Sequence, residues 1–169
     1  RKLNREPIQI FDDALPFHGA DLWTGYELSW LNPNGKPQIA ILQCSVPASS
    51  ANLIESKSFK LYLNSFNQST FENTESVRKH IQRDLSSCAE ADVNVVLVSP
   101  RAFEQMHIHS LEGNCIDDLD VQIDTYDYSP TLLSVEQSVT TETLVSHLLK
   151  SNCLITNQPD WGSVLIHYK

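Results

Sequence analysis

Apolar and polar residues alternate along two stretches near the start of the chain. The first is residues 23–30, WTGYELSW, and the second is residues 38–46, QIAILQCSV. Such period-two alternation is typical of strands that bury one face. Between them, Asn34 and Gly35 supply the residue types of a tight turn. The pattern therefore predicts a β-hairpin.

Two stretches with helical spacing follow the hairpin. Each has apolar residues three or four positions apart behind a residue suited to cap a helix, which is Ser56 in the first stretch and Thr74 in the second. The apolar stripes are Phe59, Leu63 and Phe66 in the first stretch, and Val77, Ile81, Leu85 and Cys88 in the second. We expect two amphipathic helices with charged residues on their outer faces.

Two further strands are predicted by residues 91–99, ADVNVVLVS, and residues 121–128, VQIDTYDY, which gives the order ββααββ. Residues 143–151 fit either a helix or a strand. A strand is favoured because LVSHLLKSNCLITNQPDWGSVLIHYK repeats the plan of LWTGYELSWLNPNGKPQIAILQCSV: a strand, a loop with a proline near its end, and an alternating strand. We therefore expect an α+β protein with one unit in residues 1–130 and the start of a related unit in residues 131–169.

Composition narrows the classes of function. Twelve basic and 21 acidic residues give a net charge of -9, and no basic stripe could follow a nucleic acid backbone. No apolar run reaches the roughly 20 residues that span a bilayer, and RKLNREP lacks the apolar core of a secretory signal. These features predict a cytoplasmic protein without direct nucleic acid contacts. The four cysteines form no CxxC pair, so neither a zinc site nor a disulfide framework is indicated.

The few glycines form neither of the glycine-rich loops that commonly hold nucleotides. The stretch ESKSFKLY offers another phosphate site, because Ser56, Lys57 and Ser58 stand at an expected helix start, where backbone N–H groups favour anions. A capped helix with two solvated lysines is the more common alternative. Glu55 could accept two N–H donors from a purine-like ring, although an isolated glutamate is usually only solvated.

Metal ligation has weaker support in the sequence. His107 and His109 have the spacing of two ligands on one strand face, but no third ligand is evident. The acidic run in residues 116–120, IDDLD, is more typical of a solvated loop than of a cation site. We expect no metal.

Cys153 and Asp160 stand in a predicted loop, where a rigid scaffold commonly presents reactive groups. Pro159 and Trp161 flank Asp160, and an apolar wall favours the neutral form of a carboxyl, which can donate a proton. A thiol nucleophile beside a neutral acid would make a reactive pair, although no base for the thiol is obvious. A packed thiol and a turn aspartate remain the alternative.

Two motifs, ESKSFKLYLNSF and SNCLITNQPDWGS, closely resemble the NADPH-dependent nitrile reductases of queuosine biosynthesis, the QueF family. The resemblance extends to LPFHGADLWTGYELSWLN, NCIDDLD and ETLVSHLLKSNC, and is to the longer, two-unit type. It implies the tunnelling fold, in which units with antiparallel sheets bind purine-like or pterin-like rings where units meet.

The resemblance also implies a reaction. Cys153 would attack the nitrile carbon of 7-cyano-7-deazaguanine while Asp160 protonates the nitrogen, and two NADPH would carry the covalent thioimidate on to 7-aminomethyl-7-deazaguanine. Ile54, Glu55 and Ser56 would line the substrate site, and Ser56 and Lys57 would contact NADPH. It further implies a homo-oligomer, most simply a dimer, without metal.

At the C-terminus the sequence departs from the family pattern, because it ends before the His-Glu pair that clamps the substrate ring. We therefore expect residues 1–169 alone to be inactive and to self-associate through the strand SVLIHYK, whose alternating face has no helix to cover it. Two other functions stay open: a non-catalytic purine-binding, pterin-binding or assembly module of the same fold, and a metal-dependent pterin or GTP hydrolase.

Overall fold

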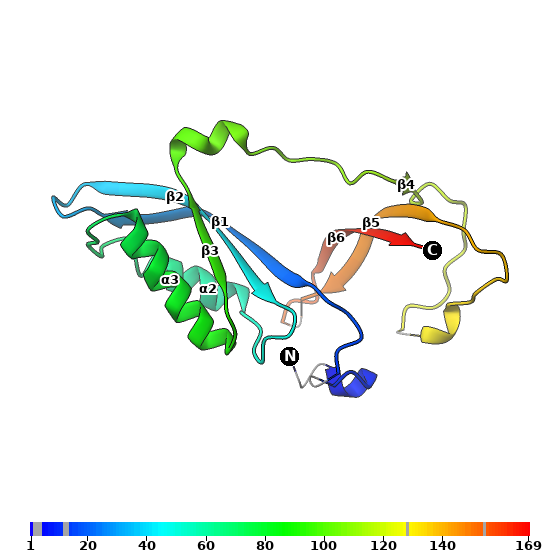
Figure 1. Ribbon diagram of the computed structural model, residues 1–169. Helices are drawn as coiled ribbons and strands as arrows, with labels where there is room; N and C mark the ends of the chain where they lie inside the picture. Colours follow the sequence, from blue (N-terminus) through cyan, green and yellow to red (C-terminus); the bar gives the residue numbers. More distant parts are fainter. Residues whose placement is uncertain (2–4, 12–13, 128, 154) are drawn as a thin grey trace. The chain divides into compact units, whose positions relative to one another are not determined.

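The computed structural model describes all residues except 2–4, 12–13, 128 and 154 (Figure 1). The described chain forms two compact units, Arg1–His107 and Ile108–Lys169. Both contain β-sheet, and the first also contains two α-helices. The mixed α and β class with mainly antiparallel sheets is therefore confirmed. The sequence predicted that a second, related unit begins after residue 130. Compactness does not test whether two segments are related, so this division stays a prediction.

The first unit is built on an antiparallel sheet in the order β1-β2-β3. Its strands are β1 (Ala20–Leu31), β2 (Pro37–Pro47) and β3 (Asn94–Val98). Helices α2 (Ser56–Asn64) and α3 (Thr74–Ala89) pack on one face of the sheet (Figure 1). Short 3-10 helices lie at Glu6–Ile8, Pro100–Gln105 and, in the second unit, Pro130–Leu132. Each predicted strand and helix of this unit is confirmed.

The core of the first unit lies between the helices and the sheet. Leu28 and Leu42 from the sheet and Val77 and Ile81 from α3 are completely buried. The predicted stripe of α3 is confirmed up to Leu85, but its last member was wrong, because Cys88 is exposed and Ala89 is buried. Four positions per repeat keep the stripe on one side of a helix, so Ala89 continues the face that Leu85 occupies.

The predicted cap residues were wrong by one position in both helices. Glu55 caps α2, with its side chain accepting from the backbone N–H groups of Lys57 and Ser58, and Ser56 is the first helical residue. Asn73, rather than Thr74, caps α3. An acidic or amide side chain can satisfy the unpaired N–H groups of a first turn as well as a serine or threonine hydroxyl does.

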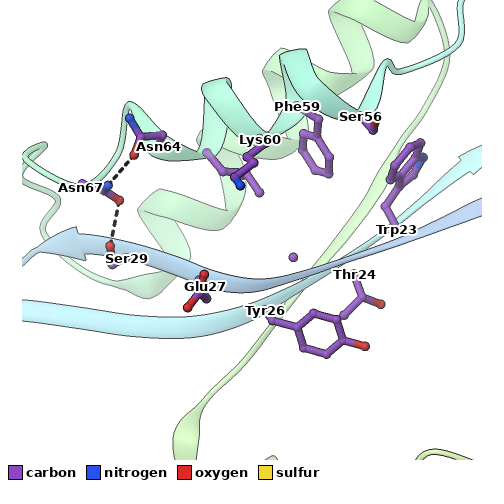
Figure 2. A pocket seen from close by; sticks show the side chains of 12 residues that line it. Trp23, Thr24, Tyr26, Glu27, Ser29, Ser56, Phe59, Lys60, Asn64 and Asn67 are labelled. Atoms are coloured by element: carbon purple, nitrogen blue, oxygen red, sulfur yellow. Dashed lines mark hydrogen bonds between the residues drawn. The ribbon is translucent and has the colours of Figure 1, made fainter. Parts of the chain in front are cut away.

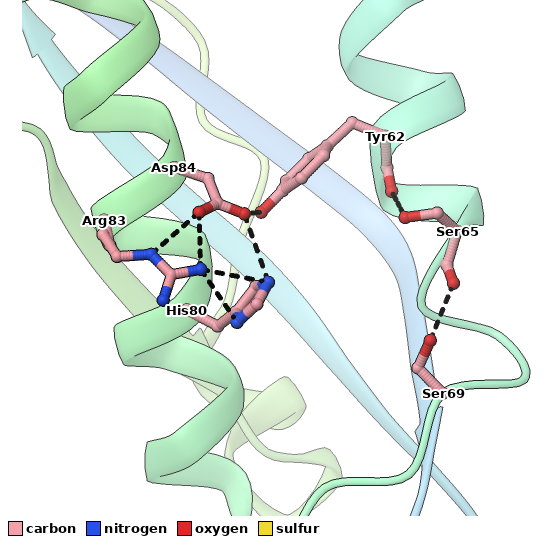
Figure 3. A network of polar contacts seen from close by, with 6 residues as sticks. All are labelled: Tyr62, Ser65, Ser69, His80, Arg83 and Asp84. Atoms are coloured by element: carbon pink, nitrogen blue, oxygen red, sulfur yellow. Dashed lines mark hydrogen bonds and ion pairs between the residues drawn. The ribbon is translucent and has the colours of Figure 1, made fainter.

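A polar network joins α2 to α3 (Figure 3). The Tyr62 hydroxyl donates to Asp84 at 2.9 Å, and Asp84 also contacts Arg83 and His80. Burial and the hydrogen bond to Asp84 raise the pKa of Tyr62. Burial alone would raise the pKa of Asp84, but hydrogen bonds from Arg83 and Tyr62 outweigh it and lower that pKa. The network keeps the two helices together and the Asp84 carboxylate ionised.

The second unit contains a sheet in the order β4-β5-β6. Its strands are β4 (Asn114–Cys115), β5 (Glu142–Asn152) and β6 (Pro159–Tyr168), with β5 and β6 antiparallel and the short β4 parallel to β5. The strand reading of residues 143–151 is confirmed. The strand predicted at residues 121–128 was wrong: residues 121–127 form none, and residue 128 lies outside the described residues.

The missing strand has a physical explanation. Alternation can stabilise a strand only where a neighbouring strand takes up its N–H and C=O groups and a partner surface covers its apolar side. In this segment Val121 and Ile123 are 64% and 66% exposed. The alternating pattern therefore has no layer to pack against within the second unit.

The β1-β2 and β5-β6 hairpins have the same strand register. Each first strand carries one extra residue at a β-bulge, located at Tyr26 and Glu27 in β1 and at His147 and Leu148 in β5. The flanking pairs are Gly25–Leu42 and Leu28–Ala40 in the first hairpin, and Ser146–Val164 and Leu149–Gly162 in the second.

The turns of the two hairpins also correspond. Pro37 and Pro159 each open the second strand, opposite the last residue of the first strand. Two positions before each proline stands a residue in the left-handed region, Gly35 at φ 75 and Asn157 at φ 56. Glycine and asparagine are the residues that adopt this conformation most readily. The repeat noticed in the sequence therefore extends to strand pairing and backbone conformation.

Candidate functional site

Glu55 stands at the turn that leads into α2, with its carboxylate exposed and held in place. Its Oε1 accepts from the Lys57 N–H at 2.9 Å, and its Oε2 accepts from the Ser58 N–H at 2.6 Å. Hydrogen bonds from the Lys57 N–H and from Ser58 lower the pKa of Glu55 to about 2. The group is thus a fixed anion with lone pairs left for further donors.

The same contacts weaken the prediction that backbone N–H groups bind a phosphate at the start of α2. Two backbone N–H groups that an anion would use already bond to Glu55. The side chains of Ser56, Lys57 and Lys60 are exposed around this turn. Any phosphate recognition here would therefore depend on one hydroxyl and two ammonium groups rather than on backbone donors.

Beside this turn, a cavity of about 690 Å³ lies between α2 and β1 (Figure 2). Phe59 and Lys60 of α2 face β1 across it, and Ser56 stands at one end. Of the four predicted residues at positions 54–57, only Ser56 lines this cavity, while Ile54 is buried and Glu55 and Lys57 are exposed outside it.

Sequence reasoning missed the β1 side of this cavity. The bulge of β1 brings Tyr26 and Glu27 to its rim, and Asn67 hydrogen-bonds Ser29 at 2.9 Å across it. The Trp23 Nε1–H, also in the lining, is buried and has no acceptor among the described residues. The WTGYEL stretch indicated only a strand, because a bulge depends on the partner strand. The available signal was the odd spacing of Trp23 and Leu28, five positions apart, which strict alternation cannot place on one face of a strand.

Cys153 begins the loop between β5 and β6 and is half-buried. Its N–H donates to the Gln158 carbonyl at 2.9 Å, and its own carbonyl accepts from the Asn157 N–H at 2.9 Å. The Asn32 N–H donates to the Lys36 carbonyl in the same way at the start of the β1-β2 turn. The backbone of Cys153 is therefore held at both its N–H and its carbonyl group.

The expectation that Asp160 lies in this loop was wrong. Asp160 is the second residue of β6 and pairs with Ser151 of β5. The expected apolar wall is also absent from the described part of this unit, because Asp160 is exposed and Trp161 is 60% exposed. A proline can open a strand whose first N–H has no acceptor, so Pro159 starts the ladder one position before Asp160. The hairpin nevertheless brings Cys153 and Asp160 to the same end of β5-β6.

The predicted residues therefore fall into two groups. Ile54, Glu55, Ser56 and Lys57 lie in the first unit, and Cys153 and Asp160 lie in the second. Among the other cysteines, Cys44 is 4% exposed and burial raises the pKa of its thiol to about 11, which suits a packed residue rather than a nucleophile. His107 and His109 lie in no strand, so their spacing does not place them on one strand face.

In the part of the chain that the structure describes, no helix is long and apolar enough to cross a membrane. One family model matches the chain over residues 1–97, which is more than half of its 169 residues. Its description is nitrile reductase, 7-cyano-7-deazaguanine-reductase, N-terminal part. The matched stretch contains the β1-β2 hairpin, both α-helices and the Glu55 turn, and it ends before Cys153 and Asp160.

Proposed function

The chain belongs to the nitrile reductase family of the 7-cyano-7-deazaguanine reductase type, and on this basis we propose that it converts 7-cyano-7-deazaguanine to 7-aminomethyl-7-deazaguanine. Membership makes it an oxidoreductase of the queuosine pathway. The observation that carries the specific proposal is the family match across the Glu55 turn, whose anion is suited to a guanine-like ring.

Recognition of the ring is assigned to Ile54, Glu55 and Ser56. A deazaguanine presents adjacent N–H donors on its pyrimidine edge, and an ionised carboxylate accepts such a pair in a bidentate arrangement. Because Glu55 is already oriented by Lys57 and Ser58, little side-chain freedom is lost when the ring binds. Ile54 supplies a buried apolar support next to it.

The covalent step is assigned to Cys153 and Asp160. The Cys153 thiolate attacks the nitrile carbon, one C≡N π bond breaks as the C–S bond forms, and the nitrogen takes a proton from Asp160. The product is a thioimidate, whose C=N accepts hydride far better than a nitrile does. Two NADPH molecules, as co-substrates held by the residues named below, would each supply one hydride. The first reduction would release the Cys153 thiolate and leave an imine, and the second, with a proton from solvent, would give the amine.

The residues of the α2 turn fit the charge of NADPH. Ser56 and Lys57 offer a hydroxyl and an ammonium to phosphate oxygens, and Lys60 adds a second exposed cation one helical turn on. These side chains provide phosphate recognition although Glu55 occupies two backbone donors of the turn.

The larger architecture is part of the proposal. We assign the chain to the tunnelling fold with tandem related units, supported by the shared register, bulge and turn of the two hairpins. Because rings bind where units meet in this fold, we also propose that the protein is a homodimer. Because the proposed substrate and NADPH are both small cytoplasmic molecules, we propose that the protein is cytoplasmic.

The test is formation of the covalent adduct. The purified protein in its natural length, incubated with 7-cyano-7-deazaguanine without NADPH, should gain one substrate mass per chain on the peptide that carries Cys153. Cys153→Ala should abolish the adduct and turnover but retain ring binding. Cys88→Ser, which removes an exposed thiol on α3, should change neither.

Two results would contradict the proposal. Ring binding without adduct or NADPH consumption would favour the non-catalytic ring-binding or assembly module. A metal-dependent reaction on a pterin or GTP without NADPH consumption would favour the hydrolase.

A further inference from the structure

Three side chains with metal-binding atoms converge in the second unit, outside the groups assigned to the reaction. They are Cys115 at the end of β4, Asp117 just after it and His147 in the bulge of β5. One sulfur, one carboxylate oxygen and one ring nitrogen all lie within 4.8 Å of one another. Sequence reasoning missed this cluster because about 30 residues separate His147 from the other two.

The fold fixes the segment that carries Cys115 and Asp117 against β5. Cys115 pairs with Val145, and the Ile116 N–H donates to the Val145 carbonyl at 3.0 Å. Gly113 permits this approach, because a Cβ there would lie 2.8 Å from the Val145 side chain and 3.0 Å from a backbone oxygen. The backbone therefore holds two of the three groups in place without any metal.

The third group is placed by the bulge. Because His147 has no paired position on β6, its N–H donates to the Asp117 carboxylate at 3.0 Å, and Ser146 donates to the other oxygen at 2.7 Å. One nitrogen of the His147 ring contacts the Ser163 hydroxyl at 2.7 Å, which orients the ring and leaves its other nitrogen for a metal.

From this geometry we infer that Cys115, Asp117 and His147 form a binding site for a single Zn²⁺ ion. A thiolate, an imidazole and one carboxylate are a ligand set typical of zinc, whereas Ca²⁺ and Mg²⁺ require mainly oxygen ligands. Cys115 and His147 are exposed, so water can complete a tetrahedral site. When the Zn–S bond forms, the thiol proton passes to solvent.

The ion would have a structural role. It would join the short β4 segment to the bulge of β5, in addition to the few backbone bonds that hold it now. Because the ion would bind only the folded arrangement, the free energy of unfolding of the second unit would rise with the logarithm of the free Zn²⁺ concentration above Kd. The inference does not depend on the proposed reductase activity, because it uses none of the residues assigned to that reaction.

Cobalt is the probe for the experiment, because Co²⁺ takes up zinc sites and reports its ligands by absorption. The metal-free, reduced protein should bind one Co²⁺ per chain, with thiolate-to-cobalt charge transfer in the near ultraviolet and visible bands of tetrahedral cobalt. One equivalent of Zn²⁺ should remove both. Cys115→Ser should abolish the charge transfer, and Ser163→Ala should weaken zinc binding by about 10- to 100-fold through loss of ring orientation.

Cys88→Ser is the matched control, because it removes another exposed thiol and should leave the cobalt spectrum unchanged. Circular dichroism of each metal-free variant checks that it is folded. Absence of charge transfer in the parent protein, or its persistence in Cys115→Ser, would overturn the site. Equal zinc affinity of the parent and the folded Ser163→Ala variant would overturn the assigned orientation of His147.

Discussion

At the scale of single residues, Asp160 is an exposed side chain on a strand rather than a group shielded in a loop. As general acid it would therefore need the bound substrate to remove water around it. Because the side chain packs against little in the described unit, its replacement should affect chemistry without affecting folding.

We predict that Asp160→Asn lowers kcat by about 10²- to 10⁴-fold, the usual contribution of a positioned general acid, with little change in KM. The amide has nearly the same shape but cannot give up a proton in this way. Steady-state NADPH consumption over a range of pH measures the effect. Asp127→Asn, an exposed carboxylate of the same unit, should behave as the parent protein. Normal turnover of Asp160→Asn would assign Asp160 a structural role only.

A second prediction at this scale concerns Glu55. Glu55→Gln keeps the size of the side chain but replaces an anion that accepts on both oxygens, so KM for the substrate should rise by about 10- to 100-fold, as expected for a hydrogen bond to a charged group. The lowered pKa of about 2 also predicts that this contribution to substrate binding stays constant from mildly acidic to neutral pH. Glu72→Gln, at another exposed position, is the control. An unchanged KM would remove Glu55 from the substrate site.

At the scale of elements, the close approach of β4 to β5 depends on one glycine. Gly113→Ala would place a methyl carbon against the Val145 side chain and the Thr143 carbonyl oxygen. Overpacking of this kind typically costs about 1–3 kcal/mol. We predict faster hydrogen exchange at the Ile116 amide, whose bond to Val145 would be disturbed.

The comparison for this variant is Gly19→Ala, since a methyl group at Gly19 would meet nothing within 4 Å. It should leave the exchange of the Ile116 amide unchanged. Protection of that amide in Gly113→Ala equal to that in the parent protein would show that the segment is not held by this contact.

At the scale of the whole molecule, acid should destabilise both units. The pKa values of Glu55, Glu75, Asp84 and Asp117 are lowered in the folded state. A carboxyl with a lowered pKa stabilises the fold above its unfolded pKa of about 4, and this contribution is lost as pH falls through the folded value. For Glu55 the window extends down to about pH 2.

We therefore predict that the urea concentration at half-unfolding falls progressively between about pH 5 and pH 2. Glu55→Gln should reduce the pH dependence in the first unit, because the amide does not titrate. Glu72→Gln should retain the parent profile. The same profile in Glu55→Gln and the parent protein would show that the contacts of Glu55 do not contribute to acid sensitivity.

The sequence by itself determined the elements whose partners are close along the chain. The β1-β2 hairpin follows from alternation around Asn34-Gly35, and the helices follow from apolar residues three or four positions apart, although the last predicted position of each stripe, Phe66 and Cys88, lies outside the helix or is exposed. The β5-β6 hairpin could be predicted because its sequence repeats the plan of the first hairpin. The resemblance carried by ESKSFKLYLNSF also identified the family that the match over residues 1–97 shows.

Tertiary structure decided everything that depends on a partner distant in sequence. Residues 121–127 alternate as a strand does, but in the described part of the chain no neighbouring strand takes up their backbone groups. Asp160 lies in β6 because the pairing of β6 with β5 begins at Pro159, and where pairing begins depends on both strands. His147 meets Cys115 and Asp117 only through a bulge and a parallel pairing. Local patterns record which face of an element is apolar, whereas pairing register and close approach depend on the surface that the rest of the chain provides.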